Sequence, residues 1–130
     1  LMRWLVDEFV SRFASFRGAS GLQSMTYLKA DHMLSRAEGT SFHEEQLAGA
    51  GASLALRWED LGTPFAVDVP PAMSSTGAHQ MYSVFVEAQQ GSITLNGQAL
   101  PGQVIVRDFL GGRLSTSFLA FCESWILPPT

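Results

Sequence analysis

The stretch from His79 to Trp125 constrains the fold most, because it consists of short apolar segments at regular intervals. Asn96-Gly97, Pro101-Gly102 and Gly111-Gly112 separate the segments, and such dipeptides are typical of tight turns. Short, evenly spaced strands with glycine-rich corners indicate an antiparallel β-sandwich or a small β-barrel.

Alternating side chains predict a strand over residues 80–88 and two more over 104–109 and 115–126. Asn96-Gly97 lies between two short apolar runs, and both residues tolerate the positive φ of a type I′ hairpin turn. The face predicted to be apolar in the first of these strands consists of Tyr82, Val84, Val86 and Ala88.

An earlier pair of alternating segments covers residues 54–58 and 65–69. Residues 59–64 contain Gly and Pro and are predicted to join the two segments as a half-buried hairpin. Pro70-Pro71 then ends the second strand, because proline cannot donate a hydrogen bond to a strand ladder.

The N-terminal part, residues 1–21, is predicted to be an amphipathic helix over 2–17 followed by a loop that begins at Gly18. Its apolar stripe at helical spacing contains Leu5, Phe9, Phe13 and Phe16.

Residues 22–38 fit a helix and a strand about equally, and their helix formers favour a helix in the second half. Gly39-Thr40-Ser41 is predicted to be a turn. Residues 42–52 are predicted to be a short turn of helix or a loop rather than a core element, because Gly and Ala alternate at their end.

Composition indicates one domain over residues 1–130, with its β core over 52–126. Hydrophobic residues make up 46% and charged residues 15% of the chain, which excludes a disordered chain. The net charge of −4 and the scattered Lys and Arg argue against nucleic acid as a partner. Low surface charge leaves apolar area to cover, so a homo-oligomer, most simply a homodimer, is expected.

Cys122 is the single cysteine, so an internal disulfide cannot form and a reducing compartment fits. Charged residues interrupt the apolar start of the chain, which argues against a secretory signal. No run approaches the ~20 apolar residues of a membrane span. A cytoplasmic protein without membrane association is therefore expected, and Leu1 leaves the native start open.

These patterns predict a mainly β fold, an antiparallel β-sandwich or small barrel with an N-terminal α-helix outside it. The alternative is an α+β arrangement, in which helices lie on one face of an antiparallel sheet.

The passage VFVEAQQGSITLNGQALPGQVIVRDFLGG, which contains Gly91, Asn96-Gly97, Leu100 and Gly102, resembles the middle of a cupin-type jelly roll. The cupin-like resemblance lies within residues 79–126 and implies a β-barrel. The metal-binding pattern of that family is not kept, because the resemblance supplies His79 alone. The resemblance therefore implies a cupin-like protein that binds no metal.

Other metal sites and nucleophiles are also poorly supported, so no cofactor is expected. His43 adjoins Glu44 and Glu45 but lacks a second His one helical turn later, and His43 is predicted to face solvent. Cys122 lies in an apolar strand without a neighbouring cation and is predicted to be a buried, inert thiol.

Three carboxylates, Glu87, Asp108 and Glu123, lie within or at the end of apolar strands, where burial would raise a carboxyl pKa. The alternative is that they line the wet face of a half-exposed sheet. Arg107 points to the face opposite Asp108 and is predicted to pair with Glu87 or Glu123.

The favoured function is non-catalytic binding of a small, partly apolar molecule within the β core. One alternative is a protein-interaction module that dimerises through the helix over 2–17 or an edge strand, and another is an enzyme with a buried carboxylate or His as general base. The candidate ligand-binding residues are His79, Tyr82, Phe85, Glu87, Asp108, Phe118 and Trp125.

Overall fold

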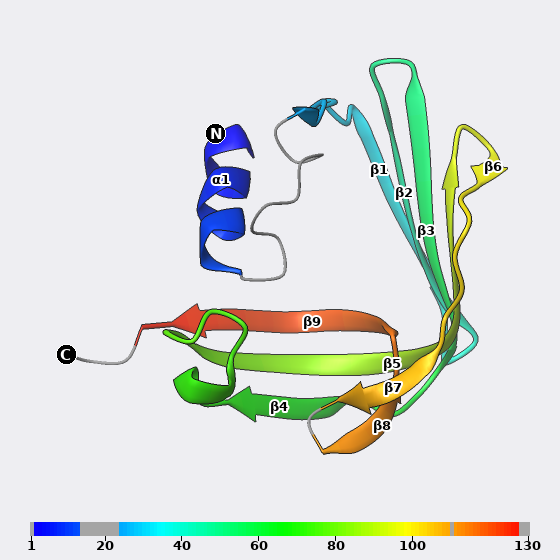
Figure 1. Ribbon diagram of the computed structural model, residues 1–130. Helices are drawn as coiled ribbons and strands as arrows, with labels where there is room; N and C mark the ends of the chain where they lie inside the picture. Colours follow the sequence, from blue (N-terminus) through cyan, green and yellow to red (C-terminus); the bar gives the residue numbers. More distant parts are fainter. Residues whose placement is uncertain (1, 14–23, 110, 128–130) are drawn as a thin grey trace. The chain divides into compact units, whose positions relative to one another are not determined.

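The computed structural model describes residues 2–13, 24–109 and 111–127, and strands dominate them (Figure 1). Helix α1 spans Met2–Arg12, and the short 3-10 helix η3 spans Pro71–Met73. The strands are β1 (His32–Glu38), β2 (Phe42–Gly49), β3 (Ala52–Leu61), β4 (Phe65–Val69), β5 (Gln80–Leu95), β6 (Gln98–Ala99), β7 (Val106–Phe109), β8 (Gly112–Ser115) and β9 (Ser117–Ile126).

One sheet holds β1, β2, β3, β5 and β4 in that order, and β6 and β9 also pair with β5. β7 and β8 form a separate two-stranded sheet. The described strand pairs for which a register is defined are antiparallel, which confirms the mainly β, antiparallel prediction. The predicted barrel is not closed, because β1 and β4 do not pair with each other in the described part of the chain.

The chain divides into two compact units. Unit 1 comprises residues 1–27, 67–83 and 123–130, and unit 2 comprises residues 28–66 and 84–122. β4, β5 and β9 each contribute residues to both units.

In unit 1, the predicted N-terminal helix is present but ends at Arg12 rather than at residue 17. Phe13 already lies outside the helix, and its ring meets the Trp125 ring edge-on at a centroid distance of 5.1 Å. Residues 14–17 lie outside the described part of the chain. Among the described residues, no helix combines the length and apolar character needed to cross a membrane.

The buried face of β5 changes along the strand, and this corrects the predicted face. Met81 and Ser83 are buried in unit 1, whereas Val86 and Ala88 are buried in unit 2. Tyr82, predicted to share the face of Val86 and Ala88, is therefore exposed. The prediction applied one uninterrupted alternation of side chains and so assigned the same buried face to the whole strand. The strand instead passes from one unit to the other between residues 83 and 84.

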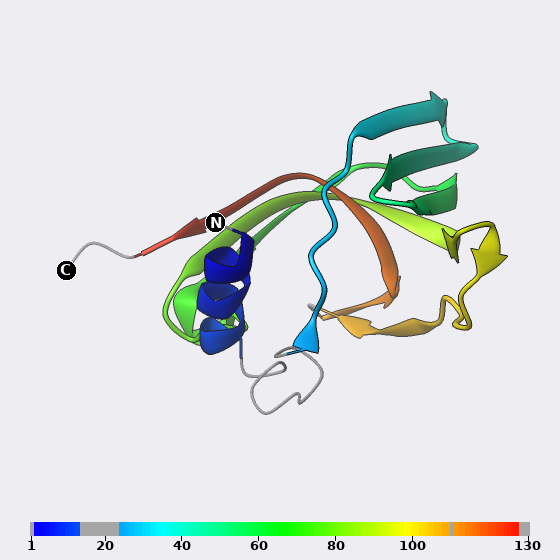
Figure 2. The same cartoon turned by 90° about the horizontal axis from the view of Figure 1, so that it is seen from above.

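In unit 2, β1, β2 and β3 form consecutive antiparallel pairs, which Figure 2 shows as neighbouring strands. The helix favoured for the second half of residues 22–38 is therefore wrong, and so is the loop or helical turn predicted for 42–52. Each residue of β2 from Phe42 to Ala48 has a partner on both β1 and β3. These ladder hydrogen bonds outweigh the local helix propensity of the segment.

Two-residue turns set the registers of two hairpins in unit 2. Ala50 and Gly51 join β2 to β3 with φ of 50° and 77°. Asn96 and Gly97 join β5 to β6 with φ of 51° and 77°, which confirms the predicted hairpin. Positive φ at both turn residues is the geometry that matches the twist of antiparallel strands.

The predicted hairpin of residues 54–58 and 65–69 is wrong in its pairing, although both strands exist. β5 lies between β3 and β4 in the sheet, and residues 59–61, predicted to turn, extend β3. β4 ends at Val69 before Pro70, as predicted. Near the C-terminus, the strand predicted over 104–109 shortens to β7, and the one over 115–126 is divided between β8 and β9.

Candidate functional site

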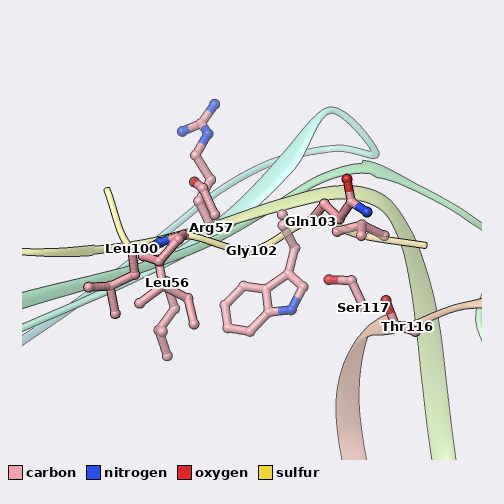
Figure 3. Close-up of a pocket in the computed structure, with 13 residues that line it drawn as sticks. Leu56, Arg57, Leu100, Gly102, Gln103, Thr116 and Ser117 are labelled. Atoms are coloured by element: carbon pink, nitrogen blue, oxygen red, sulfur yellow. The ribbon is translucent and has the colours of Figure 1, made fainter. Parts of the chain in front are cut away.

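A pocket with a volume of about 260 Å³ opens in unit 2 (Figure 3). Its base is the sheet of β3 and β5, and one wall is the loop over residues 100–104 between β6 and β7. Another wall is formed by Thr116, which follows β8, and Ser117, the first residue of β9. Figure 3 shows Leu56 and Leu100 at one end of the pocket and Thr116 and Ser117 at the other. The pocket therefore has an apolar end and a hydroxyl-bearing end.

The register of β3 and β5 builds the apolar base of the pocket. Leu56 pairs with Ile93, and Trp58 pairs with Gly91. Directly opposed residues of an antiparallel pair lie on the same face of the sheet, so all four lie on the face that bears the pocket.

Gly91 lets the pocket wall approach the sheet closely beside Trp58, because it carries no side chain. A Cβ atom at this position would lie 2.9 Å from Ser117 Oγ and 3.4 Å from Val104 Cγ2. Both neighbours belong to the pocket wall. A larger residue at position 91 would therefore push Ser117 and Val104 outward and change the shape of the pocket.

Arg57 is the ionisable residue among the described residues that line the pocket, and its charge is engaged elsewhere. Its side chain leaves β3 in the direction opposite to Leu56 (Figure 3). The guanidinium lies 3.0 Å from a Glu59 oxygen and 3.3 Å from a Glu44 oxygen, and above the Phe42 ring at 4.1 Å. The hydrogen bond to Glu59, followed by that to Glu44, raises the pKa of Arg57.

A hydrogen-bond network holds the wall formed by Thr116 and Ser117. The buried Ser115 donates its N–H to Glu87 and its hydroxyl to the Ala88 carbonyl. The Ser117 N–H donates to Ser115 Oγ at 2.9 Å, and Thr116 Oγ1 accepts the Ile105 N–H at 3.1 Å. Glu87, a candidate ligand residue and general base, thus anchors the wall through its carboxylate.

None of the seven residues predicted to bind a ligand lines this pocket. Phe85, Glu87, Asp108 and Phe118 lie in unit 2, and His79, Tyr82 and Trp125 lie in unit 1.

Phe85 and Phe118, both predicted to line a pocket, pack against each other in an aromatic cluster. Their ring centroids lie 5.3 Å apart, and the Phe118 ring also lies 6.5 Å from Phe65 and 5.8 Å from Phe109. All four residues are half-buried. The cluster thus contains two of the aromatic side chains that the sequence assigned to a pocket.

The charged candidates of β7 and β8 face solvent. The Asp108 side chain is 94% exposed and lies 4.0 Å from Arg113, so burial does not act on its carboxylate. The Arg107 guanidinium lies above the Phe109 ring at 5.2 Å, whereas the sequence predicted a pair with Glu87 or Glu123.

In unit 1, His79 is buried just before β5, and its Nδ1 lies 3.1 Å from Thr76 Oγ1. The Trp125 Nε1–H donates to Glu123 at 2.8 Å. Tyr82 is exposed. The side chains of His79 and Trp125 thus have partners within their own segments of the chain.

Sequence reasoning missed the residues that line the pocket, although two signals were present. Trp58 and Leu56 alternate with Arg57, which already indicated their common face. Gly91 interrupts a long strand pattern, and a glycine within a strand often marks a close approach of other groups. Thr116 and Ser117 gave no such signal, because only the tertiary fold brings them to β5.

Outside the pocket, His43 and Glu45 form a polar cluster with Ser35 on β1 and β2. The Ser35 hydroxyl and His43 Nε2 each lie 2.7 Å from a Glu45 carboxylate oxygen, and both donate because a carboxylate only accepts. The His43 ring packs against Trp58 and Phe121 at 6.0 and 6.4 Å. Its side chain is 19% exposed, which corrects the prediction that it faces solvent.

The described residues contain no group of three or more His, Cys, Asp or Glu side chains placed to hold a metal ion. Cys122 is exposed, which corrects the prediction of a buried thiol. The alternating pattern of β9 suggested burial on both faces, but the strand carries exposed residues over 120–123.

We expect the cluster of Ser35, His43 and Glu45 to make stability depend on acid pH. The hydrogen bonds from Ser35 and then from His43 lower the pKa of Glu45 below its ordinary value of 4.5. A carboxyl whose pKa is lowered by folding stabilises the fold above its unfolded pKa. This contribution disappears as the pH falls through the lowered, folded value.

Urea unfolding of the wild type and of Glu45→Gln from pH 7 to pH 3 tests this expectation. The difference in unfolding free energy between the two should stay constant above about pH 5 and shrink below the ordinary carboxyl pKa. In the Ser35→Ala variant, the unfolding free energy should keep only part of its dependence on acid pH. A difference that is independent of pH would contradict the assignment.

Comparisons of the chain with protein-family models, curated proteins and solved structures found no match. The resemblance of residues 79–126 to the cupin-like jelly roll stays a prediction.

Proposed function

We propose that unit 2 binds a small, uncharged, partly apolar molecule in the pocket between β3, β5 and the loop over residues 100–104. The observation that carries this proposal is the pocket of about 260 Å³, whose lining includes Leu56, Trp58 and the hydroxyl-bearing Thr116 and Ser117. An aromatic wall, an aliphatic base and a few hydroxyl groups are the usual lining of a small-molecule site.

The volume limits the size of the ligand. A cavity of about 150 Å³ is sufficient for benzene, and the pocket here has about 260 Å³. Drug-sized ligands occupy pockets of about 300–1,000 Å³. The pocket therefore fits a molecule of one or two rings rather than a nucleotide or a long chain.

The polar groups of the pocket favour an uncharged ligand with one hydrogen-bonding end. The side chains of Gln103, Thr116 and Ser117 can donate and accept hydrogen bonds. The single lining cation, Arg57, is already paired with Glu44 and Glu59. A buried anionic ligand would lose its hydration without gaining a counter-charge.

Binding rather than catalysis fits these groups. A general base must reach the proton that it removes. Of the carboxylates considered for this role, Glu87 is bonded to Ser115 and Asp108 faces solvent. The alternative of an enzyme using His79 as general base places the chemistry in unit 1, and His79 is not among the residues that line this pocket.

Titration of ¹⁵N-labelled protein with indole, benzamide and benzoate tests the proposal by NMR. Indole and benzamide should shift the Trp58 Nε1–H and Gly91 amide signals, with Kd on the order of 0.1–1 mM for molecules of this size. Benzoate has the shape of benzamide but carries a charge, and it should bind at least about 10-fold more weakly. Shifts scattered over the surface, or none, would refute the proposal.

Gly91→Leu should abolish the benzamide shifts because the new side chain displaces Ser117 and Val104 from the pocket wall. Gly112→Ala is the matched control, since a Cβ there meets nothing closer than 3.9 Å. If Gly91→Leu unfolds the protein, Ser117→Ala replaces it as the test. Loss of one hydrogen bond should weaken the binding of benzamide about 5-fold and affect the binding of indole less.

A further inference from the structure

Strand β1 is an open edge of the sheet in unit 2. Among the described residues it pairs only with β2, and all seven of its residues are exposed (Figures 1 and 2). An open edge presents unpaired N–H and C=O groups that can pair with another strand.

This edge lacks two of the usual features that prevent pairing, a bulge and a proline. The register with β2 runs without interruption from His32 to Glu38, and the strand contains no proline. Met33 is 72% exposed on one face of the strand, and Leu34 is 46% exposed on the other. Natural edge strands are commonly protected by bulges, proline or charged side chains, and of these β1 has only the charged side chains of Arg36 and Glu38.

The hairpin turn shows which backbone groups face outward. The Glu38 carbonyl accepts the Ser41 N–H within the turn, so the backbone groups of Glu38 face β2. The side to which the backbone N–H and C=O groups point alternates from one residue to the next along an antiparallel strand. The N–H and C=O groups of Met33, Ser35 and Ala37 therefore point away from β2.

We propose that two copies of this chain pair through β1, antiparallel, about a two-fold axis at Ser35. In this register the outward groups of Met33 meet those of Ala37 of the second copy, and Ser35 meets its own copy. The sheet then continues from one chain into the other. A two-fold interface uses the same surface on both chains.

Charge and apolar contacts favour this register. His32 lies opposite Glu38 of the second copy, so a cationic imidazole would face a carboxylate. The exposed Leu34 lies against the aliphatic stem of Arg36, and Met33 lies against Ala37. A two-fold axis at Arg36 would instead place Arg36 against its own copy, and like charges directly opposite each other are destabilising.

Sedimentation velocity over protein concentrations from about 1 μM to about 1 mM, the range of weak specific association, tests the pairing. The wild type should change from monomer to dimer, and Ser35→Pro should remain monomeric. The backbone N–H that proline removes faces outward, so the pairing of β1 with β2 survives. Proline also removes the hydroxyl that donates to Glu45, and Ser35→Ala removes it as well. Ser35→Ala keeps this N–H and is the control, with dimerisation equal to that of the wild type.

Disulfide cross-linking tests the register independently. Cys122 is exposed, so the background is Cys122→Ser. A mixture of Leu34→Cys and Arg36→Cys chains should form a cross-linked dimer under mild oxidation at least about 10-fold faster than either variant alone, because only the mixture opposes two thiols at bonding distance. A wild type that is monomeric throughout, a Ser35→Pro dimer, or equal cross-linking in all three samples would overturn the proposal.

Discussion

Replacement of Phe118 by alanine is expected to lower the free energy of unfolding by about 3 kcal/mol, near the lower limit for a buried phenylalanine. Phe118 packs against the rings of Phe65, Phe85 and Phe109, and it is the common member of these contacts. Its removal leaves a void that the neighbouring strands can close only in part. The lower limit applies because the ring is half-buried.

Urea unfolding followed by circular dichroism measures this loss, and the melting temperature should fall by about 10 °C for a chain of this length. Phe121→Ala is the matched control on the same strand. Phe121 is 63% exposed and its described ring contact is with His43, so the change should cost less than about 1 kcal/mol. Equal losses for the two variants would show that the aromatic cluster is not a core.

Replacement of Glu87 by alanine should lower the free energy of unfolding by about 2 kcal/mol. The change leaves the N–H of the buried Ser115 without its acceptor, and an unsatisfied buried donor costs about 1–3 kcal/mol. Glu87→Gln keeps an oxygen acceptor in the same place and should lose less than half as much.

The same urea titration compares these variants with Asp108→Ala. Asp108 is also a carboxylate of the C-terminal half, but its side chain is 94% exposed, so the expected change lies within about 0.5 kcal/mol. Because Ser115 precedes the wall of the pocket, Glu87→Ala should also weaken benzamide binding, whereas Asp108→Ala should not. Loss of stability in Glu87→Gln equal to that in Glu87→Ala would contradict the anchoring role.

Three of the predicted features that the structure confirms rest on local chemistry. Asn96-Gly97 forms its turn because both residues accept positive φ. β4 ends before Pro70 because proline cannot extend the ladder. α1 forms at the N-terminus, where apolar residues recur at helical spacing.

The candidate site was predicted only in part, because it depends on contacts between residues far apart in the sequence. Leu56 and Trp58 alternate with Arg57 along the sequence, but they pair with Ile93 and Gly91 of β5, which are more than thirty positions away. The contact between Glu87 and Ser115 spans 28 positions. Neither pairing leaves a local pattern, so the sequence offered Glu87 as a base and overlooked Ser117 as part of a wall.

By itself, the sequence determined the mainly β class, the turn at Asn96-Gly97 and the alternation that places Trp58 and Arg57 on opposite faces of one strand. Only the tertiary structure decided that β1 and β2 are strands, that β5 separates β3 from β4, and that Gly91 and Ser117 meet in the lining of a pocket. The physical reason is that turn geometry and side-chain alternation act between neighbours in the chain. Strand order and the shape of a pocket depend on contacts that form only when distant segments meet.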